Sequence, residues 1–261
     1  MSKVAEEYQY YQNSNLMIEL AAAAHQESYV GQTSSATFSE ISSRIAQMGL
    51  KPGSYILDAG CGNGAFSRLI SKKFSINVEG IDVSNKLVLE ATKLAEQEKL
   101  EKKCRFICND FTDPSSYERD LYDGIICIGS LYWGYSLTSI LNLWKKKISK
   151  EDQLLLFLNL SSSPLDIEQK RAIGETKFID AFFLKEELLT NGWEIIEWSD
   201  VTPTYIDWLQ RWNQKVSELL INIQNEMGVE NATRLVQRFS TYLDLALMGT
   251  VKRIILRAKY V

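Results

Sequence analysis

Short apolar runs alternate with amphipathic segments through the middle of the chain. The runs are rich in Ile, Leu and Val and predict strands at residues 55–58, 77–82, 105–108, 122–128, 153–160 and 193–199. The segments between them repeat apolar residues at helical spacing and predict helices at residues 65–74, 85–100, 139–148 and 185–191. This alternation is typical of a doubly wound, mostly parallel α/β sheet.

The two ends of the chain depart from this alternation. Residues 6–24 and 38–48 predict N-terminal helices, whereas residues 204–227 and 230–248 predict two helices separated by Gly228. A last strand follows at residues 251–259. We therefore expect a seven-stranded sheet with N-terminal helices and a helical lid inserted before the last strand. The expected units are a helical cover (1–48), an α/β core (49–203 and 249–261) and the lid (204–248).

Composition narrows the function classes. The 261 residues are 45% hydrophobic and 24% charged, as is ordinary for a globular protein, and the net charge is -4. Nucleic-acid binding is not expected, because the chain lacks a basic field. No apolar stretch predicts a membrane span, and the polar N-terminus does not resemble a secretion signal. We expect a reducing cytoplasm and no metal site, because there is a single histidine and the four cysteines form no CxxC pair.

The most informative segment follows the first predicted strand, which ends in Asp58 and continues into Gly60, Gly62 and Gly64. Glycine at these positions permits backbone angles that a Cβ would oppose and lets a ligand approach the main chain closely. The next strand ends in Asp82, close to the roughly 20-residue spacing at which an acid binds a ribose diol. Backbone amides and two carboxylates are thus expected at one edge of the sheet, where open sheets bind nucleotides.

The glycine spacing separates this site from two common phosphate sites. It is G-x-G-x-G rather than the G-x-G-x-x-G of dinucleotide-binding proteins, and no nucleoside triphosphate loop is present. Asp58 beside the glycines disfavours a phosphate but suits a cationic amino-acid group. After the third strand, Asp110 can accept from an adenine amino group, and we expect Phe111 to stack on the ring.

Taken in order, these motifs resemble the class I S-adenosylmethionine-dependent methyltransferases, small-molecule branch, over roughly residues 50 to 160. The resemblance is carried by Asp58-Ala59-Gly60-Cys61-Gly62-Asn63-Gly64, Gly80-Ile81-Asp82-Val83-Ser84, Asn109-Asp110-Phe111 and Tyr122-Asp123-Gly124-Ile125-Ile126. It implies a Rossmann-like methyltransferase fold with S-adenosylmethionine as cofactor and S-adenosylhomocysteine as product. The core residues that it implies for cofactor binding are Asp58, Gly60, Cys61, Gly62, Asp82, Val83, Asp110, Phe111 and Ile128.

The resemblance also gives the two ends of the chain a role. In this branch an N-terminal helix and the following loop cover the cofactor, which makes Tyr11, Tyr29 and Gln32 candidate binding residues. His25 is a candidate general base because the unperturbed imidazole pKa is near 6.5, although it also suits a helix end. Tyr132 follows the fourth strand, at the edge expected to hold the methyl group, and is the other candidate catalytic residue.

Aromatic residues mark the predicted lid. Trp208 and Trp212 are four residues apart and share a helix face, near Tyr205. Such rings can line an apolar acceptor pocket, surround a cationic amine, or simply pack the lid on the core.

The expected activity is transfer of a methyl group to a small-molecule acceptor by in-line displacement, in a monomer or homodimer. Three alternatives remain: a non-catalytic S-adenosylmethionine-binding partner or sensor, an aminopropyl transferase on the same fold, and a nicotinamide oxidoreductase, which the glycine spacing disfavours. The sequence does not identify the acceptor or the atom that is methylated.

Overall fold

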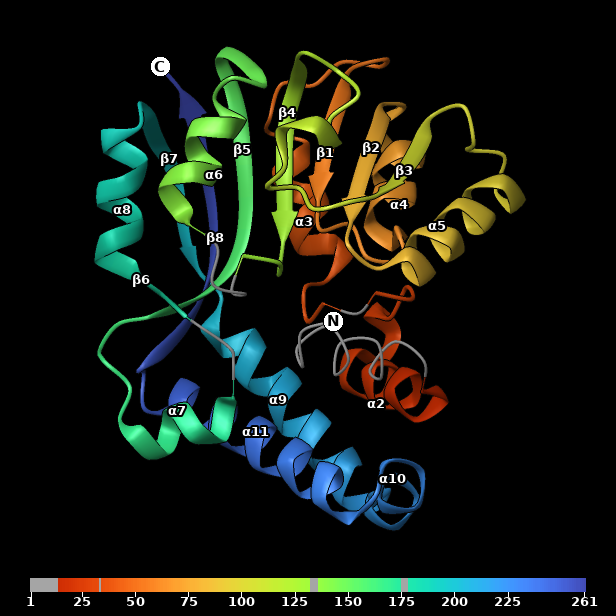
Figure 1. Ribbon diagram of the computed structural model, residues 1–261, viewed down its shortest axis with the longest axis vertical. Coiled ribbons are helices and arrows are strands. Elements are labelled where there is room, and N and C mark those ends of the chain that lie inside the picture. The colour runs from red at the N-terminus through yellow and green to blue at the C-terminus, as the bar shows by residue number, and fades with distance from the viewer. Residues whose placement is uncertain (1–13, 33, 132–135, 175–177) are drawn as a thin grey trace.

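A computed structural model describes residues 14–32, 34–131, 136–174 and 178–261. Its centre is one sheet with the strand order β3-β2-β1-β4-β5-β8-β7 (Figure 1). The strands of the described part are β1 (Tyr55–Ala59), β2 (Asn77–Asp82), β3 (Cys104–Cys108), β4 (Tyr122–Ile128), β5 (Ile148–Ser161), β6 (Ile179–Asp180), β7 (Trp193–Asp200) and β8 (Val251–Tyr260).

The mostly parallel, doubly wound fold is confirmed. Strands β1 to β5 pair in parallel, while β8 runs antiparallel to both of its neighbours, β5 and β7. The short strand β6 pairs with the end of β5 and was not predicted, because two residues are too few to make an apolar pattern.

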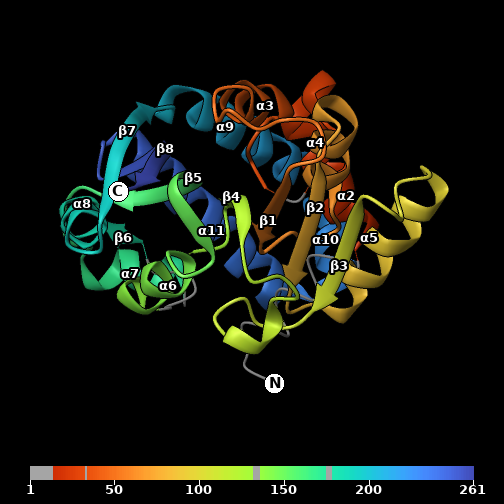
Figure 2. The ribbon, with the colours of Figure 1, turned by 90° about the horizontal axis from the view of Figure 1, so that it is seen from above.

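Helices cover both faces of this sheet, as the view from above shows (Figure 2). One face packs against α3 (Phe38–Ile45), α4 (Ala65–Phe74) and α5 (Asn85–Gln97), and the other against α6 (Leu137–Trp144) and α8 (Ala181–Thr190). Strand β4 explains this arrangement, since Ile125 and Cys127 enter one core while Ile126 and Ile128 enter the other. A continuous apolar run is what a strand buried on both faces requires.

The remaining helices lie beyond the carboxyl ends of the parallel strands (Figure 1). They are α2 (Asn15–His25), α9 (Thr202–Glu218), α10 (Leu220–Met227) and α11 (Val229–Leu247), with α7 (Ile167–Ile173) against α11. We call α2, α9, α10 and α11 the helical body.

The helical body has an apolar core of its own. Met17 and Leu20 of α2 are buried in one cluster with Trp208 and Trp212 of α9. Arg211 Nε also donates to Ala24 O at 2.7 Å. The N-terminal helix therefore packs on the inserted helices, although the sequence placed the two segments in separate units.

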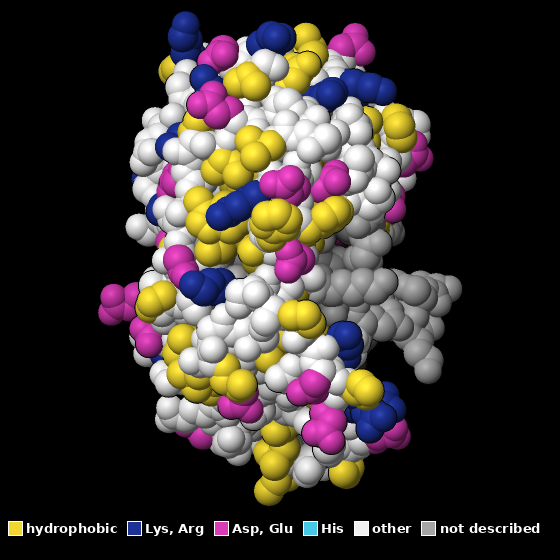
Figure 3. All heavy atoms as spheres, turned by 90° about the vertical axis from the view of Figure 1, so that its left-hand side faces the viewer, with side chains coloured by type: hydrophobic (Ala, Val, Ile, Leu, Met, Phe, Trp, Pro, Cys, Tyr) yellow, Lys and Arg dark blue, Asp and Glu magenta, His cyan; other side chains and the backbone are white. Residues whose placement is uncertain are grey.

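Apolar side chains on the side of the molecule that carries α8 and β7 form small groups separated by charged ones (Figure 3). Phe182, Phe183 and Leu189 of α8 are among the exposed apolar residues. Across the described residues, every helix is too short or too polar to pass through a bilayer.

Candidate functional site

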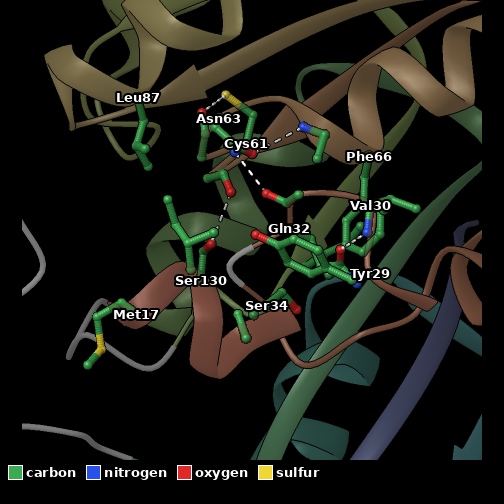
Figure 4. A pocket seen from close by; sticks show the side chains of 18 of the residues that line it. Met17, Tyr29, Val30, Gln32, Ser34, Cys61, Asn63, Phe66, Leu87 and Ser130 are labelled. Atoms are coloured by element: carbon green, nitrogen blue, oxygen red, sulfur yellow. Dashed lines mark hydrogen bonds between the residues drawn. The ribbon is translucent and has the colours of Figure 1, made fainter. Parts of the chain in front are cut away.

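A cavity of about 480 Å³ lies between the carboxyl edge of the sheet and the helical body. Core elements contribute residues 60–63 of the glycine loop, the end of β4 and side chains of α4 and α5. The loop after α2 and the helices α2, α9 and α11 close it from the other side. Figure 4 shows Met17 of α2 and Tyr29 and Gln32 of the loop among the side chains that line this cavity. The cavity thus brings together three segments that are far apart in the sequence.

The glycine loop has the backbone that the sequence predicted. Gly60, Gly62 and Gly64 have φ angles of +79°, +55° and +68°. The amides of Gly60 and Cys61 both donate to Ile81 O, at 2.8 and 3.1 Å. These bonds tie the turn after β1 to the end of β2.

Packing adds a second requirement for glycine in this loop. A Cβ on Gly60 would lie 2.2 Å from Ser130 Oγ, and one on Gly64 would lie 2.6 Å from Phe106 Cζ. At Gly60 and Gly64 the close approach is therefore to other parts of the protein, whereas the sequence analysis expected it toward a ligand.

Asp58 lines the cavity from beneath the loop. Its side chain is 3% exposed, and Oδ2 accepts from Ser67 Oγ at 2.5 Å. Burial raises the pKa of this carboxyl to about 7, the bond from Ser67 opposes the rise, and the charge of Asp82 adds to it. A cationic group brought next to Asp58 would favour its ionised form.

Asp82 connects β2 to the same loop. Its Oδ2 accepts from Gly62 N and its Oδ1 from Ser84 N, both at 2.9 Å. Burial raises the pKa of the Asp82 carboxyl, and these two backbone bonds counteract the rise. Asp82 and its exposed neighbour Val83 lie outside the cavity wall, at the end of β2.

The segment after β3 agrees only partly with the prediction. Asp110 Oδ1 accepts from the backbone amide and the hydroxyl of Thr112, both at 2.8 Å, and so forms a turn. Phe111 is 3% exposed and packs in the core with its ring centroid 6.2 Å from that of Trp144. The ring of Phe111 is thus surrounded by protein, and its stacking on adenine stays a prediction.

The loop after α2 is held by Gln32. The Gln32 amide donates to Ser28 O and Ala36 O, and its Oε1 accepts from Val30 N. These contacts make Gln32 a brace within the loop, at the cavity wall. Tyr29 also lines the cavity, and burial followed by the charge of Glu90 raises the pKa of its hydroxyl.

Asn63 joins this loop to the glycine loop. Its Nδ2 donates to Gly31 O at 2.8 Å, and its own carbonyl accepts from Arg68 Nη1 at 2.6 Å. In the sequence, Asn63 stands within the glycine motif, and no separate role was predicted for it. No spacing signal connects it to Gly31, because the two residues meet only in the folded chain.

His25 lies outside the main cavity. It is 4% exposed at the end of α2, with Nε2 2.9 Å from Ser34 O and its ring against Trp208. Burial lowers the pKa of the imidazole to about 4. It borders a separate cavity of about 180 Å³ with Glu40 and Arg211. This placement matches the helix-end alternative and separates His25 from the cavity wall that contains Asp58, Tyr29 and Gln32.

Of the remaining predicted site residues, one lines the cavity and two belong to segments that the structure does not describe. Ile128 lines the cavity at the end of β4. Tyr11 and Tyr132 lie outside the described residues.

The helical body supplies an aromatic wall, which we define as Trp208, Trp212, Phe239 and Tyr242; all four line the cavity. Ring centroids are 5.0 Å apart between Trp208 and Trp212 and 4.6 Å apart between Trp212 and Phe239. Trp208 and Trp212 were predicted from the sequence, whereas Phe239 and Tyr242 were not. Phe239 and Tyr242 are three residues apart in a predicted helix, and this spacing could have indicated that the two rings share one helix face. Tyr205 lies behind the wall, with the guanidinium of Arg253 3.9 Å from its ring centroid.

No group of three or more His, Cys, Asp or Glu side chains that could hold a metal ion is found among the described residues. The cavity wall instead combines the buried carboxyl of Asp58, the glycine loop and the aromatic rings of α9 and α11.

Comparison with known proteins agrees with this geometry. The family described as a methyltransferase domain matches residues 56–146. A sterol 24-C-methyltransferase of Aspergillus fumigatus is 42% identical over 65 residues, which are 25% of this chain and 17% of the relative. The curated relatives are matched over only 14 to 25% of their own length.

Two solved structures share the fold. A cyclopropane synthase of Mycobacterium tuberculosis superposes with a TM-score of 0.80 at 16% identity, covering 95% of each chain. A geranyl diphosphate C-methyltransferase of Streptomyces coelicolor, in complex with S-adenosylhomocysteine, gives 0.70 at 13% identity, covering 85% of this chain and 78% of that one. At these identities the similarity establishes the architecture.

Proposed function

We propose that this chain is a class I S-adenosylmethionine-dependent methyltransferase, which transfers the methyl group of that cofactor to a small-molecule acceptor. The observation that carries the proposal is that one cavity is lined both by the glycine loop with Asp58 and by the aromatic wall. One space of about 480 Å³ thereby offers a polar region and an apolar region side by side.

The polar region fits the cofactor. Asp58 is a buried carboxyl, and burial raises its pKa to about 7. A cationic amine beside it would favour the ionised carboxylate and pair with it. The glycine loop brings main-chain groups to the same wall. Asp82 is the candidate for the ribose hydroxyls and Asp110 for adenine. Tyr29 and the loop braced by Gln32 cover the methionine part.

S-adenosylmethionine supplies an electrophilic methyl group on a cationic sulfur. The protein contributes the positions of the reacting groups and the polarity of their surroundings. The end of β4, with Ile128, Gly129 and Ser130, lies in the wall that also holds Asp58 and the rings. Fixing nucleophile, methyl and sulfur in line lowers the barrier by orientation, and an apolar surrounding favours dispersal of positive charge.

The proposal needs no histidine base. His25 borders the smaller cavity. Burial lowers the pKa of its imidazole to about 4, so the ring is neutral at neutral pH. Tyr132, which follows β4 in the sequence, remains a candidate for contact with the acceptor.

The cofactor assignment is tested by calorimetric titration with S-adenosylmethionine, S-adenosylhomocysteine and NAD. Binding of the first two without NAD supports it, and preferential NAD binding would remove it. Turnover is then tested by mass spectrometry with a panel of small acceptors. Cofactor binding without methyl transfer to any acceptor in that panel would favour a non-catalytic binding partner.

We also propose a cytoplasmic protein that does not bind nucleic acid. The net charge is -4, and the four cysteines are unpaired in the described structure. Fractionation of cells and size-exclusion chromatography would test location and whether the chain is a monomer or a homodimer.

A further inference from the structure

We infer that Ser67 is a positioning residue for the cofactor, because its hydroxyl holds the Asp58 carboxylate ionised and oriented toward the ammonium group of the amino-acid part. This inference rests on the proposed function and adds a residue that acts on the ligand only through Asp58. Ser67 is not part of the described cavity wall, and no role was predicted for it from the sequence.

The glycine turn brings the two side chains together. Helix α4 begins at Ala65, directly after this turn, and Ser67 lies in its first turn, nine residues after Asp58. Ser67 Oγ donates to Asp58 Oδ2 at 2.5 Å, and the two residues are 0% and 3% exposed. Because both groups are shielded from water, their hydrogen bond restrains the carboxyl more strongly than a bond at the surface would.

The Asp58 carboxyl keeps one oxygen available for a ligand. Oδ2 is bound by Ser67, whereas Oδ1 accepts no hydrogen bond from the described residues. A carboxylate accepts through both oxygens, and Asp58 lines the cavity, so Oδ1 can accept from an amine while Oδ2 stays fixed. The hydroxyl of Ser67 therefore sets the orientation in which Asp58 meets the cofactor.

The other surroundings of Asp58 favour its neutral form. Burial raises the pKa of this carboxyl to about 7, and the like charge of Asp82 on β2 adds to the rise. Burial also raises the pKa of the three thiols that interact with Asp58, so they carry no charge at neutral pH; these belong to Cys61, Cys104 and Cys127. Within the described structure, the Ser67 hydroxyl is the group that favours the ionised carboxylate.

The test is a calorimetric titration with S-adenosylhomocysteine between about pH 5.5 and 8.5. In the natural protein the affinity should rise as the pH passes through about 7, because ionised Asp58 pairs with the ammonium group. Ser67→Ala should displace this rise upward by about one pH unit and weaken binding at neutral pH about fivefold. An affinity that does not depend on pH, or the same profile in both proteins, would overturn the inference.

The matched control is Ser71→Ala. Ser71 lies one turn later on α4 and is also 0% exposed, and its Oγ donates to Ile76 O at 2.8 Å. Both substitutions remove a buried hydroxyl from the same helix, but only Ser67 bonds to a carboxyl. We expect Ser71→Ala to keep the natural pH profile. A displacement equal to that of Ser67→Ala would show a general effect of the helix and overturn the inference.

A double substitution separates an effect through Asp58 from a direct effect of Ser67. Asp58→Asn cannot ionise, so it should lose the rise of affinity with pH, and the addition of Ser67→Ala should change the profile no further. The deamino analogue of S-adenosylhomocysteine lacks the ammonium group, and Ser67→Ala should not weaken its binding. A displacement that persists beside Asp58→Asn, or an equal loss of affinity for both ligands, would overturn the inference.

Two further measurements make the outcome decisive. If Ser67→Ala does not fold, Ser67→Cys retains a weaker donor and should displace the profile upward by a smaller amount. The affinity of the natural protein for S-adenosylhomocysteine is measured first. No binding at any pH would refute the proposed function, whereas binding with a pH profile that Ser67 does not affect would refute only the inference about Ser67.

Discussion

The side-chain amide of Asn63 and the carbonyl of Gly31 lie 2.8 Å apart and connect the glycine loop to the loop that follows α2. The two residues belong to the core and to the segment that leads into the helical body. Since Asn63 and Gly31 both line the cavity, this bond closes its wall on the side proposed for the cofactor.

Asn63→Ala should weaken cofactor binding by about 1 kcal/mol, because the covering loop loses its hydrogen bond to the glycine loop. Calorimetric titration with S-adenosylhomocysteine measures the effect. The matched control is Asn77→Ala, which removes a similar bond from Nδ2 to Gly53 O at 2.9 Å, outside the cavity wall. Equal losses of affinity in the two variants would show that the bond acts only on general stability.

Asp82→Ala should lower the affinity for S-adenosylhomocysteine by about 1–3 kcal/mol, through loss of charge-assisted hydrogen bonds to the ribose. Asp82→Asn should fall between this variant and the natural protein, since one carbonyl oxygen remains. Asp200→Ala provides the comparison, because Asp200 also ends a strand and accepts from the following Thr202 amide. Unchanged affinity in a folded Asp82→Ala protein would remove the ribose assignment.

Asp58 should make the free energy of unfolding fall as the pH rises from about 4 to about 7. The folded pKa of about 7 lies above the ordinary value of 3.8, so in this window the folded protein keeps a proton that the unfolded chain releases. Asp58→Asn removes this dependence. Its stability relative to the natural protein should therefore increase with pH up to about 7 and then level off, as followed by urea unfolding. A difference that does not change with pH would contradict the assignment.

His25 should act in the opposite direction. Its folded pKa of about 4 lies below the ordinary 6.5, so between these values the unfolded chain binds a proton that the folded protein does not. The free energy of unfolding should fall as the pH drops through this window, and His25→Gln should lessen the fall. The same variant should retain methyl transfer. A rate limb near pH 6.5 that vanishes in His25→Gln would instead identify a catalytic base.

Gly60→Ala should cost about 1–3 kcal/mol more stability than Gly53→Ala. Both glycines have positive φ angles, +79° and +90°, so the backbone strain is shared. A Cβ on Gly53 would meet open space, whereas one on Gly60 would overlap Ser130. Denaturant unfolding of the two variants measures the difference, and equal losses would mean that the Ser130 side chain moves aside freely.

Much of the core could be predicted from local sequence. The boundaries of α4, β2 and β4 match the predicted ranges, because each combines a clear apolar period with a local stop signal. The helix predicted from residue 85 begins there, and the hydroxyl of Ser84 directly before it accepts from Leu87 N. The positive φ angles of the glycine loop were likewise expected from residue type alone.

The helical body shows where local sequence stops being informative. An amphipathic pattern gives the apolar face of α2 but not its partner, and Met17 and Leu20 pack with α9. Phe111 was expected at a ligand and lies in the core, because an aromatic residue after a strand fits either place until its neighbours are known. The same holds for His25, whose burial between α2 and Trp208 sets its pKa.

The sequence by itself determined the order of strands and helices, the glycine turn and the acids at the strand ends, since these depend on residue types within one or two turns of chain. Only the tertiary structure decided that the N-terminal and inserted helices form one body, that Asn63 meets Gly31, and that α9 and α11 together form the aromatic wall. Contacts between distant segments depend on the shape and burial of both partners, and neither partner's local sequence contains that information.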